Sequence, residues 1–352
     1  MRGQERAFSA LLVFSAPARQ HTFGQPVFPA DLCWPLLSTG NLAHYVQLKL
    51  SAVHAFLHRL FSLSVVYDMR GEVDFIHCPV LGVQSRPQPK LTDSEVITIE
   101  VVGSYLGLSQ DKALFAYFQR HYAHFSPALR LLDRTTFARQ ASNLWAVKER
   151  IWCWIRDEVV SYDPGMSIVD SVPVPVCRFA RAPWCVRFRG GASYGKDHAD
   201  RQTFYGFRLH VQLGWPGVLM RAFLAPANEA DGAIVPLLVE GTSGVVLGDR
   251  NSWLPDLQTL LQSRGILLQA PFRKAHSPKA AAYQSPVLGR VRYLIDTVFG
   301  QLTERCQMKR VWARDLWHLR NRLLRYFLMH TLCFLFNQQD AAPSLQFDRL
   351  VV

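Results

Sequence analysis

Three aspartates are the residues of this chain whose types and positions are best suited to chemistry. Asp170 lies in the apolar, β-branched stretch 167–177, and Asp249 directly follows the apolar run 244–248. Asp296 interrupts an otherwise apolar helical face. Carboxylate oxygens from separate elements are ligands that Mg²⁺ prefers. Two such ions, about 3.5–4 Å apart, stabilise the attacking and leaving oxygens of an in-line phosphoryl displacement. The three aspartates therefore indicate a metal-dependent phosphoryl-transfer site.

Each of these carboxylates also has a purely structural interpretation. Asp170 could accept backbone hydrogen bonds in the turn after its strand. Asp249 could belong to a turn formed with Arg250 and Asn251, and Asp296 could form an ion pair with Arg292 on its own helix. Any one carboxylate is weak evidence, but the order of the three in a basic chain favours the metal-binding interpretation.

The elements predicted after residue 161 would bring the first two aspartates together. They are a strand from Ser167 that the prolines at 173 and 175 end, strands at 202–214, 218–225, 244–248 and 265–269, and helices at 228–239, 254–263 and 285–306. Pro216 and Gly217 form a hairpin turn between the second and third strands. In open α/β sheets, ligands bind where the carboxyl ends of neighbouring strands line a crevice. If the first and fourth strands are neighbours, Asp170 and Asp249 face one crevice.

The preceding part of the chain predicts helices. After the breaker at 86–90, Thr92 and Glu95 fit a capping box that opens a helix toward Leu106. A second helix is predicted at 111–122, and a third begins near Asp133 with apolar residues at helical spacing as far as Ile151. These helices could form a helix-turn-helix docking surface or only a packed bundle.

The fold class is therefore α/β: a mixed five-stranded sheet flanked by helices and preceded by a helical N-terminal domain. We divide the chain into a weakly patterned extension at 1–85, a helical and DNA-binding region at 86–160, a catalytic domain at 161–337 and a tail at 338–352. Within the extension, 43–63 could hold one helix. Arg2, Arg6 and the apolar run 7–14 resemble a secretory signal, but a poorly ordered extension is the preferred interpretation.

Composition points to a polyanionic partner. The chain has 39 Lys and Arg against 27 Asp and Glu, a formal net charge of +12, which favours nucleic acid or an anionic membrane surface. Its 7 cysteines include no C-x-x-C pair, which argues against a disulfide framework or a zinc ribbon and indicates a reducing, cytoplasmic compartment. The apolar stretch 323–336 is too short to span a bilayer, and no long amphipathic basic helix supports a peripheral membrane protein.

Basic residues in three regions are predicted to contact DNA. On the last helices, Arg314, His318, Arg322 and Arg325 recur at spacings of four and three, which predicts a stripe that follows phosphates; an ordinary solvated face is the alternative. His210 is predicted to be a satisfied core histidine, and Trp312 and Trp317 to pack rather than stack on bases. The predicted DNA-binding residues are Arg134, Arg139, Arg187, Arg189, Lys196, Arg305, Lys309, Arg310, Arg314 and Arg322.

Several motifs resemble bacterial insertion-sequence transposases of the DDE type. They are Asp170-Ser-Val-Pro-Val-Pro-Val-Cys177, Tyr205-Gly-Phe-Arg-Leu-His210, Ala227-Asn-Glu-Ala-Asp231, Gly248-Asp249 and Asp296-Thr-Val-Phe-Gly-Gln-Leu-Thr-Glu304. The similarity runs from about residue 88 to about 337 and is closest to insertion-sequence family nine-eighty-two. It implies an RNase H-like core, two Mg²⁺ or Mn²⁺ ions, cleavage at terminal inverted repeats of double-stranded DNA and strand transfer by a freed 3′-hydroxyl. A homo-oligomer in a synaptic complex is also implied.

The family's first two aspartates correspond to Asp170 and Asp249. Its third acid is usually Glu, and here it is Asp296, whose side chain is one methylene shorter. Glu304 is a fallback ligand, although it lies about 80° around the helix from Asp296. A displacement of about 1 Å at a reacting centre can cost on the order of 100-fold in rate. Two alternatives stay open: an RNase H-like nuclease without strand transfer, and a decayed copy that only binds DNA.

Overall fold

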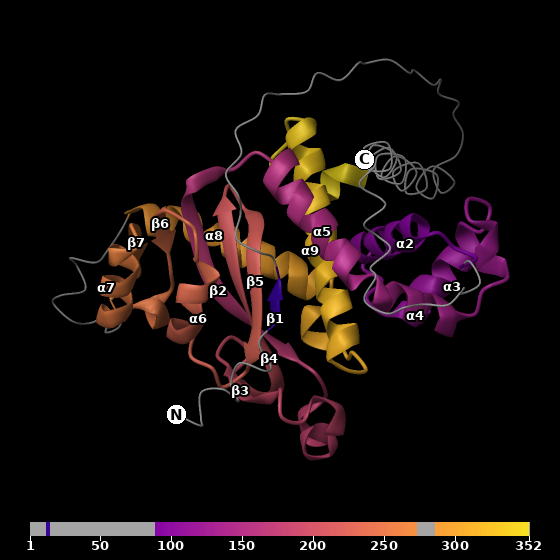
Figure 1. The fold of residues 1–352 in the computed structure, drawn as a ribbon, viewed down its shortest axis with the longest axis horizontal. Coiled ribbons are helices and arrows are strands. Elements are labelled where there is room, and N and C mark those ends of the chain that lie inside the picture. The colour runs from indigo at the N-terminus through magenta and orange to yellow at the C-terminus, as the bar shows by residue number, and fades with distance from the viewer. Residues whose placement is uncertain (1–11, 15–88, 273–285, 352) are drawn as a thin grey trace, which may run out of the picture.

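The computed structural model describes residues 12–14, 89–272 and 286–351 (Figure 1). The helix predicted at 43–63 and the interpretations of the N-terminal extension lie outside these residues, apart from a short strand, β1 (Leu12–Phe14).

The centre of the described fold is a mixed β-sheet. The strands predicted from the sequence are β2 (Asp163–Pro175), β4 (Gln202–Trp215), β5 (Val218–Pro226), β6 (Gly244–Leu247) and β7 (Ile266–Gln269). The strand order is β1-β5-β4-β2-β6-β7, with β3 (Ser193–Asp197) also paired to β4. β2 is antiparallel to β4 and parallel to β6, so the first and fourth predicted strands are neighbours. The described sheet has 7 strands rather than five because β1 and β3 extend it.

Strand β2 continues through the two prolines that were predicted to end it. Its pairing with β4 persists to Pro175, opposite Gly206. β6 pairs with β2 only over Met166–Ile168 among the described residues. Both prolines lie beyond that stretch, and their nitrogens face the side of β2 away from β4, where no other described strand lies, so their missing N–H groups interrupt no ladder.

The hairpin between β4 and β5 forms where the turn residues predicted it. Gly217 adopts a φ of 126°, a conformation that L side chains rarely adopt. The hairpin brings Leu213 opposite Leu219.

Helices cover both faces of the sheet (Figure 1). On one face, α6 (Asp231–Leu238) and α7 (Pro255–Ser263) enclose a small core with Val169, Phe223 and Val246. On the other face lie α8 (Pro286–Gly300), which contacts β2, and α9 (Leu316–Gln339), which contacts β5. Most residues of α9 are buried, as expected for a helix with elements packed around it.

The predicted N-terminal helices pack on the far side of α9. They are α2 (Asp93–Tyr105), α3 (Asp111–His121), α4 (Arg134–Asn143) and α5 (Trp145–Trp154). The capping box is present: Thr92 Oγ1 accepts from Glu95 N at 3.3 Å, and the Thr92 N–H donates to Glu95 Oε2 at 2.8 Å. The third predicted helix is divided into α4 and α5 at Leu144. One hydrophobic core includes these helices, α8, α9 and the adjoining sheet face.

Short helical turns connect the main elements. They are the 3-10 turns Pro127–Arg130, Phe179–Trp184, Val186–Phe188, Arg250–Ser252, Met308–Arg310 and Phe347–Val351, and the π turns Ile155–Val159 and Gln301–Arg305. Among the described residues, no helix is both long enough and apolar enough to cross a membrane.

Candidate catalytic site

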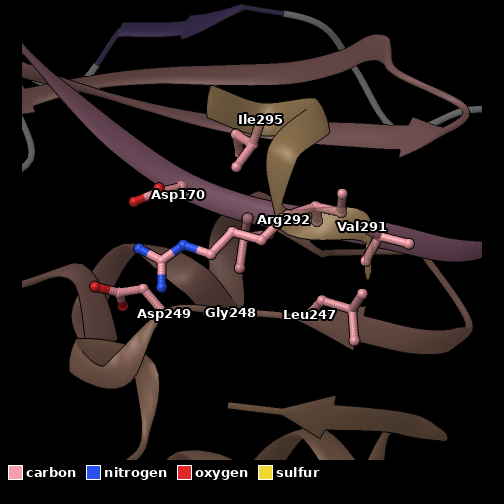
Figure 2. Close-up of a pocket in the computed structure, with 9 residues that line it drawn as sticks. Asp170, Leu247, Gly248, Asp249, Val291, Arg292 and Ile295 are labelled. Atoms are coloured by element: carbon pink, nitrogen blue, oxygen red, sulfur yellow. The ribbon is translucent and has the colours of Figure 1, made fainter. Parts of the chain in front are cut away.

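The sheet register brings Asp170 and Asp249 side by side. Ile168 of β2 is paired with Leu247 of the parallel strand β6. Each aspartate lies two residues after its member of this pair, at the carboxyl end of β6. Both line one small pocket, with α8 forming its opposite wall (Figure 2). The sequence prediction that these two carboxylates face one crevice is therefore correct.

Local hydrogen bonds hold both carboxylates in place. Asp249 caps the turn Arg250–Ser252: its Oδ1 accepts from Asn251 N at 2.9 Å and from Ser252 N at 3.0 Å. Asp170 Oδ1 accepts from Ser171 N at 2.7 Å. Gly248 is needed between strand and turn, because a Cβ there would lie 2.8 Å from Ser252 Cβ. The turn interpretation of Asp249 is thus correct, and it does not remove the carboxylate from the pocket.

The pocket makes the charge on Asp170 unfavourable. The pKa of Asp170 is raised to about 7, chiefly by burial and then by the charges of Asp249 and Asp231, against the lowering effects of the Ser171 N–H and the Arg292 guanidinium. Such a carboxylate pair is stabilised by a cation between its members.

Arg292 is a site residue that the sequence reasoning considered only as a partner of Asp296. It lies on α8 and lines the pocket together with Val291 and Ile295. Its guanidinium extends between the carboxylates of Asp170 and Asp249 (Figure 2). Its position one helical turn before Asp296 was the available signal.

The structure does not bring Asp296 or Glu304 into this pocket. Both side chains are exposed, and neither lines the pocket. The described residues include no group of three or more His, Cys, Asp or Glu arranged to hold a metal ion. The roles of Asp296 and Glu304 as ligands therefore stay predictions.

A polar network lies beside Asp170. Ser171 Oγ donates to Asp231 Oδ1 at 2.8 Å and accepts from Arg208 Nη1 at 3.3 Å. His210 Nδ1 lies 3.4 Å from the same Asp231 oxygen. Because successive strand residues point to opposite faces, this network fixes the backbone of β2 from the face opposite Asp170. Asp231 entered the sequence analysis only as the last residue of a motif.

His210 is buried, as predicted, but it is not fully satisfied. Its Nε2 has no hydrogen-bond partner among the described residues. Burial, and then the charge of Arg208, lower the pKa of His210 to about 3. The imidazole is therefore neutral at physiological pH.

Most of the predicted DNA-binding residues are exposed, while some of them, such as Arg305 and Lys309, have intramolecular partners. Arg305 contacts Tyr105 and Asp348, and Lys309 lies 2.8 Å from Asp197 and 2.7 Å from Asp200. The exposed members are Arg134, Arg139, Arg187, Arg189, Lys196, Arg310 and Arg314.

The exposed stripe predicted along the last helix is wrong in its second half. Arg322 is buried and lies 2.9 Å from Asp111. Arg325 is 0% exposed and also lies 2.9 Å from Asp111. These arginines join α9 to α3, so Arg322 is a structural residue rather than a DNA contact in this fold.

The fold and the paired aspartates by themselves indicate a class of domain. A mixed sheet in this order, with one aspartate within β2 and the other directly after the end of its parallel neighbour β6, is consistent with an RNase H-like domain. Residues 161–316 match the family model described as a transposase DDE domain. No curated protein matches the chain. The match supports a DNA transposase of the DDE type and includes all three predicted aspartates.

Proposed function

We propose that this protein is an insertion-sequence transposase of family nine-eighty-two. It cleaves phosphodiester bonds at the ends of its element and joins the freed 3′-hydroxyl to target DNA. The observation that carries the proposal is the pairing of Ile168 in β2 with Leu247 in β6, which brings Asp170 and Asp249 into one pocket beside two inner strands of the sheet. The match of residues 161–316 to the transposase DDE domain supports the same activity.

Two of the three expected ligands, Asp170 and Asp249, lie where they could hold a divalent cation. Asp170 and Asp249 offer hard oxygen ligands, and burial together with the charge of Asp249 raises the pKa of Asp170, an effect that a bound cation would offset. Bound Mg²⁺ or Mn²⁺, two ions in this class of reaction, would activate the attacking oxygen and stabilise the leaving oxygen. Asp296 is the proposed third ligand and Glu304 its fallback.

The remaining residues hold the carboxylates and the substrate. The turn after β6 fixes Asp249, and the Ser171–Asp231 hydrogen bond fixes the strand beside Asp170. Arg292 supplies positive charge between the carboxylates in the conformation described here. The exposed basic residues bind the backbone of double-stranded DNA that carries terminal inverted repeats. The active assembly is a homo-oligomer in a synaptic complex, acting in the cytoplasm.

Cleavage of DNA that carries the ends of the element tests this proposal. With Mg²⁺ or Mn²⁺ we expect nicks at the ends by the unaltered protein and none by Asp170→Asn. Asp163→Asn is the matched control, because Asp163 is an exposed aspartate on the same strand, and it should cut normally. If neither the unaltered protein nor Asp296→Glu cuts with either metal, the catalytic assignment is wrong.

A second candidate function is DNA binding without catalysis by a decayed copy. It is favoured by the exposure of Asp296 and by Arg292 in the pocket. This candidate predicts salt-sensitive DNA binding that is indifferent to metal. Cleavage by Asp296→Glu but not by the unaltered protein would identify it. A nuclease without strand transfer would instead cut DNA without joining the 3′ end to a target.

A further inference from the structure

A hollow of about 420 Å³ lies beyond the carboxyl end of β2. We call it the Arg–Trp pocket and define it by the residues that line it: Val176, Cys177, Arg178, Arg181 and Trp312. Val176 is on the same face of the strand as Asp170, six residues further on, which corresponds to about 20 Å. The pocket is therefore separate from the paired carboxylates.

The backbone holds Trp312 toward solvent. Trp312 is 47% exposed although Val311 and Ala313 on either side of it are buried. Its φ of 41° is unusual for a bulky residue. The buried neighbours fix the segment, so the indole cannot turn inward without displacing them. Such a conformation persists only where the surroundings impose it.

Trp317 shows what an ordinary exposed tryptophan looks like in this fold. It is exposed to the same extent, 48%, but its ring packs edge-on against Trp145 with 5.6 Å between centroids. The ring of Trp312 instead lies beside a cation, the Arg178 guanidinium, whose central carbon is 5.8 Å from the ring centroid. Trp312 thus lies in a pocket lined by arginine, whereas Trp317 completes a hydrophobic contact.

The surroundings of the Arg–Trp pocket are basic and aromatic. Arg178 and Arg181 are both exposed. Phe179 and Tyr194, also exposed, lie edge to face with 6.0 Å between their centroids. Aromatic rings next to cations along a groove are what proteins use to bind single-stranded nucleic acid, because every base has a face that can stack.

We propose that the Arg–Trp pocket binds an unpaired base of single-stranded DNA. The base stacks on Trp312, and Arg178 and Arg181 bind the neighbouring phosphates. The inference rests on the proposed function in taking DNA as the substrate. It adds that the protein binds a locally opened strand at a point about 20 Å from the catalytic carboxylates.

Binding of a short fluorescent oligothymidine to the full chain tests this inference. Measured with EDTA present, so that no cleavage occurs, Trp312→Leu should weaken binding about 5- to 100-fold. The matched variant Trp317→Leu should change it less than about twofold. Trp312→Tyr keeps an aromatic ring and should restore most of the affinity. Thermal unfolding of each variant identifies those that have lost the fold.

An abasic strand of the same length separates base stacking from phosphate binding. Trp312→Leu should leave its affinity unchanged, whereas Arg178→Gln should weaken both strands. Equal effects of Trp312→Leu on the two strands, or equal effects of Trp312→Leu and Trp317→Leu on oligothymidine, would overturn the proposal. Base-dependent binding by a protein that never cleaves would contradict the proposed function and leave this inference standing. Cleavage without base-dependent binding would support the proposed function and overturn this inference.

Discussion

Asp170 is buried and lies close to a second carboxylate, and both conditions disfavour its charged form. Its position brings it next to Asp249, and burial, with the charges of Asp249 and Asp231, raises its pKa to about 7, well above the usual range of an aspartate. The folded chain therefore retains a proton that the unfolded chain has lost between about pH 4 and pH 7. Stability from this group is fully present below pH 4 and is lost as the pH rises through 7.

Asp170→Asn should remove this pH dependence. The neutral amide keeps an oxygen for the Ser171 N–H but carries no charge at any pH. At pH 8 without metal, we expect a free energy of unfolding higher by on the order of 2–4 kcal/mol. Urea unfolding at pH 5 and pH 8 measures it. Equal pH dependence in the variant and the unaltered protein would show that Asp170 is not the group responsible.

Arg292 and a bound metal ion would compete for the same two carboxylates. Arg292→Gln removes one positive charge from between Asp170 and Asp249, so Mn²⁺ affinity at pH 8 should rise roughly tenfold. Titration calorimetry measures it. Arg264→Gln, which removes the same charge from the end of α7, is the control and should have no effect. Weaker Mn²⁺ binding by Arg292→Gln would contradict competition.

At the scale of elements, buried ionic contacts join the N-terminal helices to α9. Lys148 of α5 is completely buried and contacts Glu100 of α2 and Asn321 of α9. Asn321 Nδ2 also donates to Glu100 Oε1 at 3.0 Å. Three helices distant in sequence therefore depend on one network, in which each buried charge needs its partner.

Glu100→Ala should destabilise the protein by about 3–5 kcal/mol, because it leaves the Lys148 ammonium buried without its carboxylate. Chemical denaturation measures the loss. Asp348→Ala is the matched control: it breaks the contact of a carboxylate that is 94% exposed with Arg305 and should cost less than about 1 kcal/mol. A Glu100→Ala loss no larger than that of the control would show that the network is not coupled.

At the scale of the whole molecule, the helical layer and the sheet share a hydrophobic core. Buried residues of α9 such as Leu324 and Phe327 belong to the same core as Val102 of α2 and Trp152 of α5. The domain boundary predicted near residue 160 therefore does not separate two hydrophobic cores, because the packing crosses it.

A fragment that begins at residue 161 should therefore fail to fold on its own. It would expose the surface of α9 that α2 and α5 cover, and exposed apolar surface of that kind leads to aggregation. A fragment that begins at residue 89 should unfold cooperatively. Binding of a hydrophobic dye and the unfolding transition distinguish the two. A soluble, cooperatively unfolding 161–352 fragment would show that the sheet domain is independent.

Local patterns in the sequence were sufficient for the elements and for the paired aspartates. Alternating apolar residues predicted strand β4, helical spacing predicted the helix that becomes α4 and α5, and a capping box predicted α2, because these patterns depend only on neighbouring residues. The order of strands was enough to predict that Asp170 and Asp249 lie together, because it made β2 and β6 parallel neighbours. The predicted position of Asp170 at the end of its strand was wrong, because β2 continues to Pro175. The prolines of β2 led to the wrong prediction that the strand ends there. A missing N–H weakens a strand only on the side where a neighbouring strand would accept its hydrogen bond.

The tertiary structure alone decided what the charged and aromatic side chains do. Arg322 and Arg314 belong to one helical stripe in sequence, yet Arg322 meets Asp111, 211 positions away, and is buried. Arg292 lies in the pocket of Asp170 and Asp249, and Trp312 lies in a pocket lined by arginines, because folding brings those partners from other parts of the chain. Helical spacing reports which face a residue shares with its neighbours. The partner of that face comes from another part of the chain, and only folding brings it there.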